Sequence, residues 1–251
     1  AKKNLMYIDS IIPFAFSYKD ALQMLKKHIN TRFYVNKAVF KNITEKDVKG
    51  IYLNAFVFDY LTSTTYSGVL SYTRKYENEK GEIETQTAYK TVNGVFEKMY
   101  PNITIEASEH IEQEDLRAIM PYEYASAVDF NEDFMHSYIL EYKDKMFANC
   151  TDVVEKIIKK HIEDDILRKY NCDNIVRLST NTTYLDKKYN YCLLPMYKFT
   201  SIYKDKRYDA LMNGQSGKIG NLPKNIWRIL LTIFIACGFV VGLILLVLFL
   251  K

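Results

Sequence analysis

Residues 50–100 read GIYLNAFVFDYLTSTTYSGVLSYTRKYENEKGEIETQTAYKTVNGVFEKMY and carry the clearest structural pattern in the chain. Aromatic and β-branched residues are frequent, and apolar side chains alternate with polar ones over much of the stretch. The polar run ENEKGE at 77–82 interrupts this alternation. The pattern predicts two long antiparallel strands that are joined by a hairpin.

Helices are predicted before and after this hairpin. The first follows Ser17, which forms a capping-box pattern with Asp20 and precedes apolar residues at helical spacing. A short helix is expected to end at Pro121. Two further helices are predicted from the spacing of aromatic residues and of branched aliphatic residues. The four predicted helices are 17–29, 110–119, 130–147 with Phe134, Tyr138, Tyr142 and Met146, and 151–169.

Strands return in the last part of the chain, at 174–184, 188–203 and 207–213. A helix therefore precedes strands in each half of the chain. This order predicts an α+β fold of two related lobes, each a helix with an antiparallel sheet, followed by one transmembrane helix. The predicted lobes are residues 1–105 and 106–224, and the predicted transmembrane segment is 226–250.

The C-terminal stretch from Ile229 to Leu250 reads ILLTIFIACGFVVGLILLVLFL and has no charged residue. A helix of this length rises roughly 30 Å, which matches the hydrocarbon thickness of a bilayer. The alternative is a buried core helix, which rarely runs so long without a polar stripe. Basic residues before the stretch predict a single-pass protein of the cell membrane with a cytoplasmic body. The predicted flank consists of Lys218, Lys224, Trp227 and Arg228.

Gly238 and Gly242 form a Gly-x-x-x-Gly pattern inside this stretch. The spacing lets two helices approach closely, and it predicts a homo-oligomer or contact with a partner helix. Such pairs also occur by chance.

Composition limits the other classes of function. The formal net charge is +4 and both signs are mixed along the chain. This charge is too small and too dispersed to predict nucleic-acid binding. The cysteines are scattered, which fits a reducing compartment and predicts no disulfide framework. They are Cys150, Cys172, Cys192 and Cys237.

Several short landmarks occur in a set order. They are Ile12-Pro13-Phe14 before the first helix, Lys49-Gly50-Ile51-Tyr52 at the first strand, Met120-Pro121-Tyr122 after a short helix, and Leu194-Pro195-Met196-Tyr197 in a later strand. The last landmark is the most specific and contains Tyr208, Asn213, Gly214, Gln215, Gly217, Lys218 and Pro223. On these residues the chain resembles bacterial membrane-anchored TFIIB-type zinc-ribbon-containing proteins over about residues 8–224.

This resemblance implies a non-enzymatic scaffold or adaptor of a bacterial membrane protein complex. Relatives are often encoded beside SPFH/band-7 (flotillin-like) proteins, which implies such a partner in membrane organisation or envelope stress. The Cys-x-x-Cys pairs of the family are missing here, and Asn54-Ala55-Phe56 replaces its usual continuation after the first strand. No cofactor or metal is therefore predicted in this chain, and any zinc is expected in a segment before Ala1.

Two groups of residues invite a catalytic interpretation. The run NGQSGKIG at 213–220 does not have the spacing of a phosphate-binding P-loop, and it is interpreted as a structural turn. Glu163, Asp164 and Asp165 lie near His161, but consecutive helical residues point in different directions, which favours a solvated face. The sequence therefore predicts no enzyme. The alternative is a ligand-binding or enzymatic domain that uses a cleft between the two lobes.

Overall fold

The fold is given by a computed structural model. The structure describes residues 8–77, 81–107, 113–135, 138–140 and 147–249. The chain divides into two compact units, each assembled from segments that are far apart in the sequence. Unit 1 consists of residues 1–9, 55–109 and 143–192, and unit 2 consists of residues 10–54, 110–142 and 193–251.

The strands belong to a mixed sheet. In the described part of the chain it has eight strands, in the order β3-β2-β6-β1-β4, with β5 beside β2, β7 beside β6 and β8 beside β7. The β2–β5 pair is parallel, whereas β2–β3 and β6–β7 are antiparallel. The bounds are β1 Ser10–Ile11, β2 Val48–Glu77, β3 Ile83–Glu106, β4 Val128–Asp129, β5 Ile139–Leu140, β6 Asn174–Tyr203, β7 Lys206–Asn213 and β8 Ile219–Gly220.

The predicted hairpin is confirmed. Strands β2 and β3 pair from Ala55 opposite Glu106 to Glu77 opposite Ile83, with one irregularity between Phe58 and Tyr60. Strand β2 ends at Glu77 and β3 begins at Ile83, so the polar run that interrupts the alternation lies between the two strands in the sequence. Because the side chains alternate between the two faces of the sheet, β2 directs every second residue into the core of unit 1.

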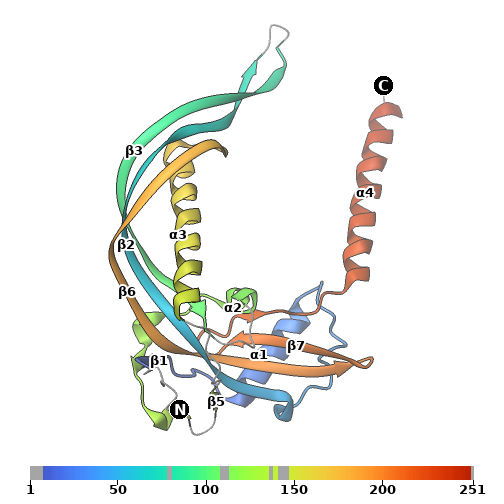
Figure 1. The fold of residues 1–251 in the computed structure, drawn as a ribbon. Helices are drawn as coiled ribbons and strands as arrows, with labels where there is room; N and C mark the ends of the chain where they lie inside the picture. Colours follow the sequence, from blue (N-terminus) through green and yellow to red (C-terminus); the bar gives the residue numbers. More distant parts are fainter. Residues whose placement is uncertain (1–7, 78–80, 108–112, 136–137, 141–146, 250–251) are drawn as a thin grey trace. The chain divides into compact units, whose positions relative to one another are not determined.

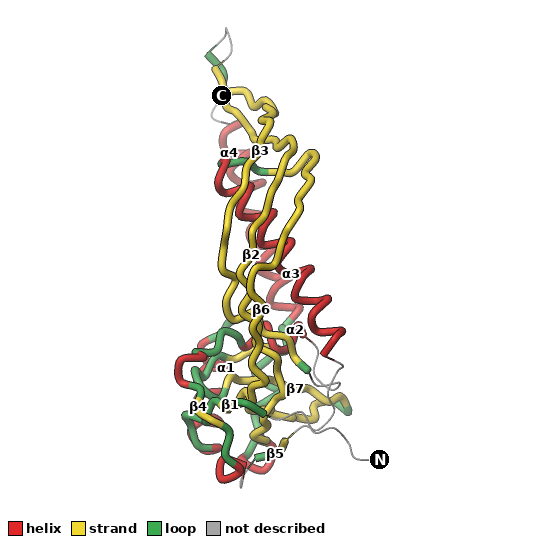
Figure 2. The backbone as a smooth tube through the Cα atoms, turned by 60° about the vertical axis from the view of Figure 1, so that its left-hand side comes forward, coloured by secondary structure: helices red, strands yellow, loops and turns green. Residues whose placement is uncertain are grey.

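Helix α3 (Phe147–Tyr170) closes that core. It lies along the strands of unit 1 (Figures 1 and 2) and presents a stripe of buried side chains, spaced at four residues, to β2, β3 and β6. Each fully buried aliphatic side chain contributes about 1.5–3 kcal/mol relative to exposure. The stripe is Cys150, Val154, Ile158, Ile162 and Ile166, each at most 1% exposed.

A glycine permits the close approach of β6 to β2 in unit 1. A Cβ atom added to Gly68 would lie 2.2 Å from the carbonyl oxygen of Arg177 and 2.9 Å from the Cα atom of Leu178. Both of these are backbone atoms, which cannot rotate away as a flexible side chain can. Any larger residue at position 68 therefore forces the two strands apart.

We expect Gly68→Ala to lower the free energy of unfolding by about 2 kcal/mol or more, because a methyl group meets backbone atoms of β6. Urea unfolding followed by circular dichroism measures the change. The matched control is Ser67→Ala, which alters an exposed neighbour on the same strand. Equal unfolding midpoints for the two variants would contradict the close contact.

Unit 2 is built around α1 (Tyr18–Thr31). The predicted capping box is confirmed: the backbone N–H of Asp20 donates to Ser17 Oγ at 3.2 Å, and the Ser17 N–H donates to Asp20 Oδ2 at 3.3 Å. The apolar face of α1 packs on side chains of β6 and β7. The buried residues of this contact are Ala21, Leu22, Leu25 and Ile29 of α1, and Tyr197, Phe199, Ala210 and Met212 of the strands.

The helix predicted at 130–147 is wrong. The described residues of this range form a 3-10 turn at Glu132–Met135 and strand β5, and Tyr142 and Met146 lie outside the described residues. Tyr138 does not belong to an amphipathic helix but stacks on the Phe14 ring, with centroids 4.0 Å apart. Tyr138 is therefore placed by packing on a ring that is distant in the sequence and not by a helical repeat. The short helix is present as α2 (Gln113–Ile119).

The predicted fold class is also wrong. Strands β2 and β6 are continuous and contribute residues to both units, so the chain forms one mixed sheet instead of two repeated helix-plus-sheet lobes. Neither unit coincides with residues 1–105 or 106–224, since both are assembled from separated segments.

Helix α4 (Ile226–Phe249) occupies the predicted transmembrane segment. In the part of the chain that the structure describes, no helix has the length and apolar character needed to cross a membrane. The predicted transmembrane helix from Ile229 to Leu250 is thus contradicted, and so is the single-pass membrane location with a cytoplasmic body.

Candidate functional site

Four of the sequence landmarks meet in unit 2. The main-chain N–H of Gly214 donates to the Pro195 carbonyl at 2.8 Å, and the Tyr122 hydroxyl donates to the same oxygen at 2.9 Å. The Gly214 carbonyl in turn accepts the N–H of Ala15 at 2.9 Å, next to Phe14. Two main-chain hydrogen bonds and one from the Tyr122 hydroxyl therefore hold together segments that lie apart in the sequence, and Ala15 and Gly214 are the most distant of these residues.

Asn213 is the polar centre of this junction and is fully buried. Its amide nitrogen donates to the carbonyls of Ile119 and Pro121, both at 3.1 Å. Its amide oxygen accepts the N–H groups of Gln215 and Ser216, at 2.8 and 2.9 Å. All four hydrogen-bonding positions of the side-chain amide are thus used, which is what a buried asparagine requires.

Gln215 and Lys218 extend the same contact to the segment after α2. The Gln215 side chain accepts the N–H of Glu123 at 2.8 Å and donates to the Glu123 carbonyl at 3.0 Å. The Lys218 ammonium donates to the Met120 carbonyl. Lys218 was predicted as part of a membrane flank. In the structure its ammonium group lies at the Met120 carbonyl oxygen.

The two glycines of the landmark have different roles. Gly217 has φ +74°, a backbone conformation that strongly favours glycine. At position 214 a side chain does not fit, because a Cβ atom there would lie 2.6 Å from the Phe14 ring and 2.8 Å from the Pro195 Cβ atom. The run at 213–220 therefore forms a tight turn after β7 whose groups bind other parts of unit 2.

Aromatic rings pack beneath this turn. The Phe14 ring lies 4.9 Å from Tyr52 and 4.7 Å from Tyr197, measured between ring centroids, in addition to its stacking on Tyr138. The Tyr197 hydroxyl donates to the Phe16 carbonyl. Burial raises the pKa values of the Tyr52 and Tyr197 hydroxyls above the ordinary value, so both rings are neutral at physiological pH. The cluster is a packed core and offers no ionised group for chemistry.

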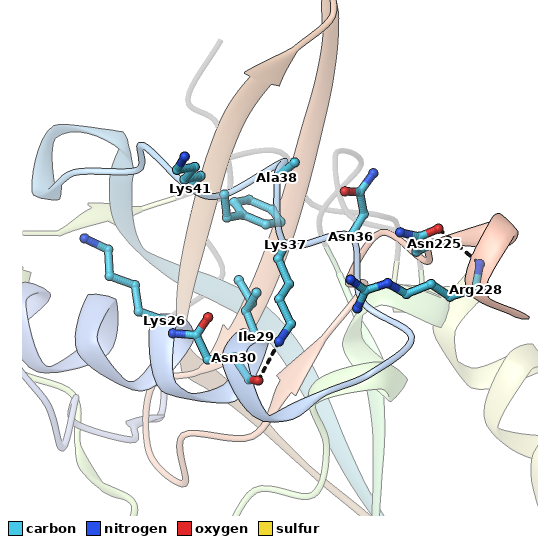
Figure 3. A pocket seen from close by; sticks show the side chains of 10 residues that line it. Lys26, Ile29, Asn30, Asn36, Lys37, Ala38, Lys41, Asn225 and Arg228 are labelled. Atoms are coloured by element: carbon cyan, nitrogen blue, oxygen red, sulfur yellow. Dashed lines mark hydrogen bonds between the residues drawn. The ribbon is translucent and has the colours of Figure 1, made fainter.

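A basic hollow of about 590 Å³ lies at another place in unit 2 (Figure 3). It is bordered by the last turns of α1, the loop that follows, and the start of α4. Its floor contains the buried side chains of Ile29 and Phe40. The charged and amide residues around it are Lys26, Asn30, Asn36, Lys37, Lys41, Asn225 and Arg228. No carboxylate is among the described residues that line it.

The remaining predicted residues lie apart from the junction. Trp227 is 82% exposed at the start of α4, and Lys224 forms an isolated antiparallel bridge with Val35. A Cβ atom added to Gly238 or Gly242 meets no described atom within 4 Å, so the structure shows no helix packed against them. Tyr208 belongs to β7, and the Pro223 carbonyl accepts the N–H of Asn36 at 2.9 Å.

The acidic residues near His161 belong to unit 1, and one of them does not lie on a simple solvated face. Asp165 accepts hydrogen bonds from Lys98 at 2.6 Å, from the Tyr100 hydroxyl at 2.9 Å and from Arg168 at 2.6 Å. Burial acts to raise the pKa of the Asp165 carboxyl, but the bonds from Lys98 and Tyr100 outweigh it and lower that pKa. The carboxylate therefore ties α3 to β3.

Possible metal ligands and cysteine thiols were also located in the structure. In the described residues no three His, Cys, Asp or Glu side chains are grouped as metal ligands. The four cysteines are free thiols, and two of them, Cys150 and Cys192, are buried.

Strand β3 of unit 1 lies at an edge of the sheet. β3 pairs with β2 on one side, and no described strand pairs with its other side. Tyr89 and Val95 point to the same face of the sheet and are 67% and 61% exposed. From Thr91 to Phe96 the strand has neither a charged residue nor a proline.

Comparison with known proteins gives little further information. No family model matches the chain, and no solved structure matches it. The chain is 24% identical over 218 residues to "Uncharacterized protein YdjG" of Bacillus subtilis (strain 168). This match covers 85% of the chain but only 62% of that relative's length. None of this bears on the resemblance to the zinc-ribbon family, which stays a prediction.

We expect Asn213→Ala to lower the free energy of unfolding by about 2–4 kcal/mol, because the substitution removes four hydrogen bonds of a buried side chain, including the one to the buried Ile119 carbonyl. Thermal unfolding measures the change. The control is Asn42→Ala, which removes an exposed amide of the same unit. If the two variants melt alike, Asn213 does not hold the landmarks together.

The Asp165 contacts predict a dependence of stability on pH. Because the folded-state pKa is lowered, the stabilisation is complete above the unfolded pKa of about 4 and is lost as the pH falls through the folded pKa. We expect Asp165→Asn to cost about 1–3 kcal/mol at pH 7 and progressively less towards pH 2. Urea unfolding across this pH range tests it, with Asp164→Asn as the exposed control. A pH-independent difference would exclude this mechanism.

Proposed function

We propose that this chain is a non-enzymatic scaffold or adaptor that binds an extended segment of another protein along β3. The observation that carries the proposal is that β3 ends the order of the sheet, with no described strand on its outer side; in its central part the Asn93 carbonyl accepts the Tyr170 hydroxyl at 3.1 Å. A strand at the edge of a sheet presents a row of unpaired N–H and C=O groups, which are a template for a further strand.

The side chains beside this edge support the proposal. Natural edge strands are usually protected by charges, prolines or short length. The centre of β3 between Thr91 and Phe96 has none of these features, and Val95 and Tyr89 add exposed apolar surface next to it. Charged residues Lys90 and Glu97 flank the uncharged centre, which favours one register of a partner strand.

The groups that were considered for catalysis support a binding role. Asp165 is held by Lys98, Tyr100 and Arg168, and the landmark turn at 213–220 uses its polar groups for contacts inside unit 2. An SPFH/band-7-type protein is the partner that the family resemblance implies. The alternative function, a ligand or enzyme site in a cleft between the predicted lobes, stays a prediction.

The test is the variant Tyr89→Lys/Val95→Lys, because lysine side chains beside the edge oppose strand addition. The full chain is purified from its own cells in a mild detergent, which is needed because α4 exposes apolar side chains such as Phe234. Mass spectrometry then identifies proteins that co-purify in stoichiometric amount. We expect one such protein with the wild type and its loss from the variant.

The control is Val128→Lys/Ile202→Lys, which adds the same charge at exposed strand positions of unit 2. This control should retain the partner, and all variants should keep the wild-type melting temperature. The proposal is overturned if the wild type carries no partner, if only a second copy of the chain is bound, or if both variants release the partner equally.

A further inference from the structure

The positive charge of the chain is concentrated in one part of unit 2. Residues 17–49 contain eight Lys and Arg residues against three Asp and Glu residues, whereas the net charge of the whole chain is +4. The remaining residues together are therefore close to neutral. The fold brings part of this basic segment around the hollow described above.

Four cations reach the hollow from three elements. Lys26 lies on α1, Lys37 and Lys41 lie on the loop after it, and Arg228 lies in the first turn of α4. Figure 3 shows Arg228 extending from α4 towards the loop that carries Lys37. Residues that are nearly 200 positions apart in the sequence thus place like charges around one space. Such a group of like charges is unfavourable without a counter-charge.

Contacts among the described residues explain two of these cations. Lys37 Nζ donates to the Asn30 carbonyl at 2.8 Å, and Arg228 Nη1 donates to the Phe33 carbonyl at 3.1 Å. Both oxygens lie at or just after the end of α1, where carbonyls lack helical partners. Each cation keeps further N–H donors, since an ammonium has three and a guanidinium has five.

Lys26 and Lys41 have no such explanation. Neither forms an ion pair or a side-chain hydrogen bond with any residue in the described ranges. Their charges stand beside a hollow whose described lining has no carboxylate to balance them. These two lysines are therefore available to an external anion.

Helix α4 adds to the positive electrostatic potential around the hollow. Asn225 precedes the helix, and its amide oxygen accepts the N–H of Arg228 at 3.3 Å. The N-terminal end of a helix carries a partial positive charge, and here this end borders the hollow. The opposing partial charge at the end of α1 is reduced by Lys37, which bonds the Asn30 carbonyl.

We propose that this hollow binds a small anion that carries phosphate groups. Lysine ammonium groups and an arginine guanidinium are the side chains that bind phosphate oxygens, and the amides of Asn30, Asn36 and Asn225 supply neutral hydrogen bonds. The volume of about 590 Å³ fits a small-molecule ligand. The site lies in unit 2, whereas β3 belongs to unit 1, so the proposal does not depend on partner binding along β3.

Isothermal titration calorimetry on the full chain in mild detergent tests the site with inorganic pyrophosphate and, separately, ATP. The variant is Lys26→Ala/Lys41→Ala, whose ammonium groups form no ion pair or hydrogen bond among the described residues, so we expect it to keep the wild-type melting temperature. We expect affinity for pyrophosphate to fall about tenfold or more. Tighter binding of ATP than of pyrophosphate would identify a nucleotide, and equal affinities a phosphate group alone.

The control is Lys19→Ala/Lys27→Ala, which removes the same charge from α1 without altering the lining of the hollow. Its affinity should stay within about twofold of the wild type. Absence of pyrophosphate and ATP binding by the wild type would overturn the proposal. An equal loss of affinity in the two variants would do so too, because it would show attraction by net charge alone.

Discussion

The rest of the structure depends on one continuous strand, β2, which lies between β3 and β6 in the sheet and pairs with β3 from Ala55 to Glu77. Its 30 residues extend through both compact units, so the same backbone orders the core under α3 and the strands next to α1. Gly68 shows how closely the strands are fitted, since even a methyl group there would meet backbone atoms. A strand with neighbours on both sides cannot shift register without exposing its buried face.

Unit 2 is held by polar contacts as much as by apolar ones. Asn213 uses every donor and acceptor of its side chain, and the Pro195 carbonyl accepts two hydrogen bonds. A buried network in which each group is satisfied fixes one arrangement of the chain, because any alternative leaves polar atoms without partners. The turn at 213–220 therefore resembles a nucleotide-binding loop only in composition, as its polar groups are consumed inside the unit.

The two proposed sites have different physical origins. The edge of β3 follows from topology: a strand that ends the order of a sheet has unpaired backbone groups whatever its sequence. The basic hollow follows from side chains that α1, its loop and α4 bring together. The hollow was not predicted because the net charge of the whole chain conceals a local excess of basic residues. The excess of basic residues at 17–49 was the available signal, but only the return of Arg228 to this loop makes it a site.

Local patterns by themselves determined several elements of this protein. The capping box of Ser17, the hairpin with its polar turn, and the apolar face of α3 were predictable because neighbouring residues define them. The segment around Tyr138 was not, since its ring is placed by Phe14, which is distant in the sequence. The order of strands and the contacts of Asn213 were likewise decided only by tertiary structure. Each depends on which distant parts of the chain come into contact, and side-chain periodicity indicates only local secondary structure.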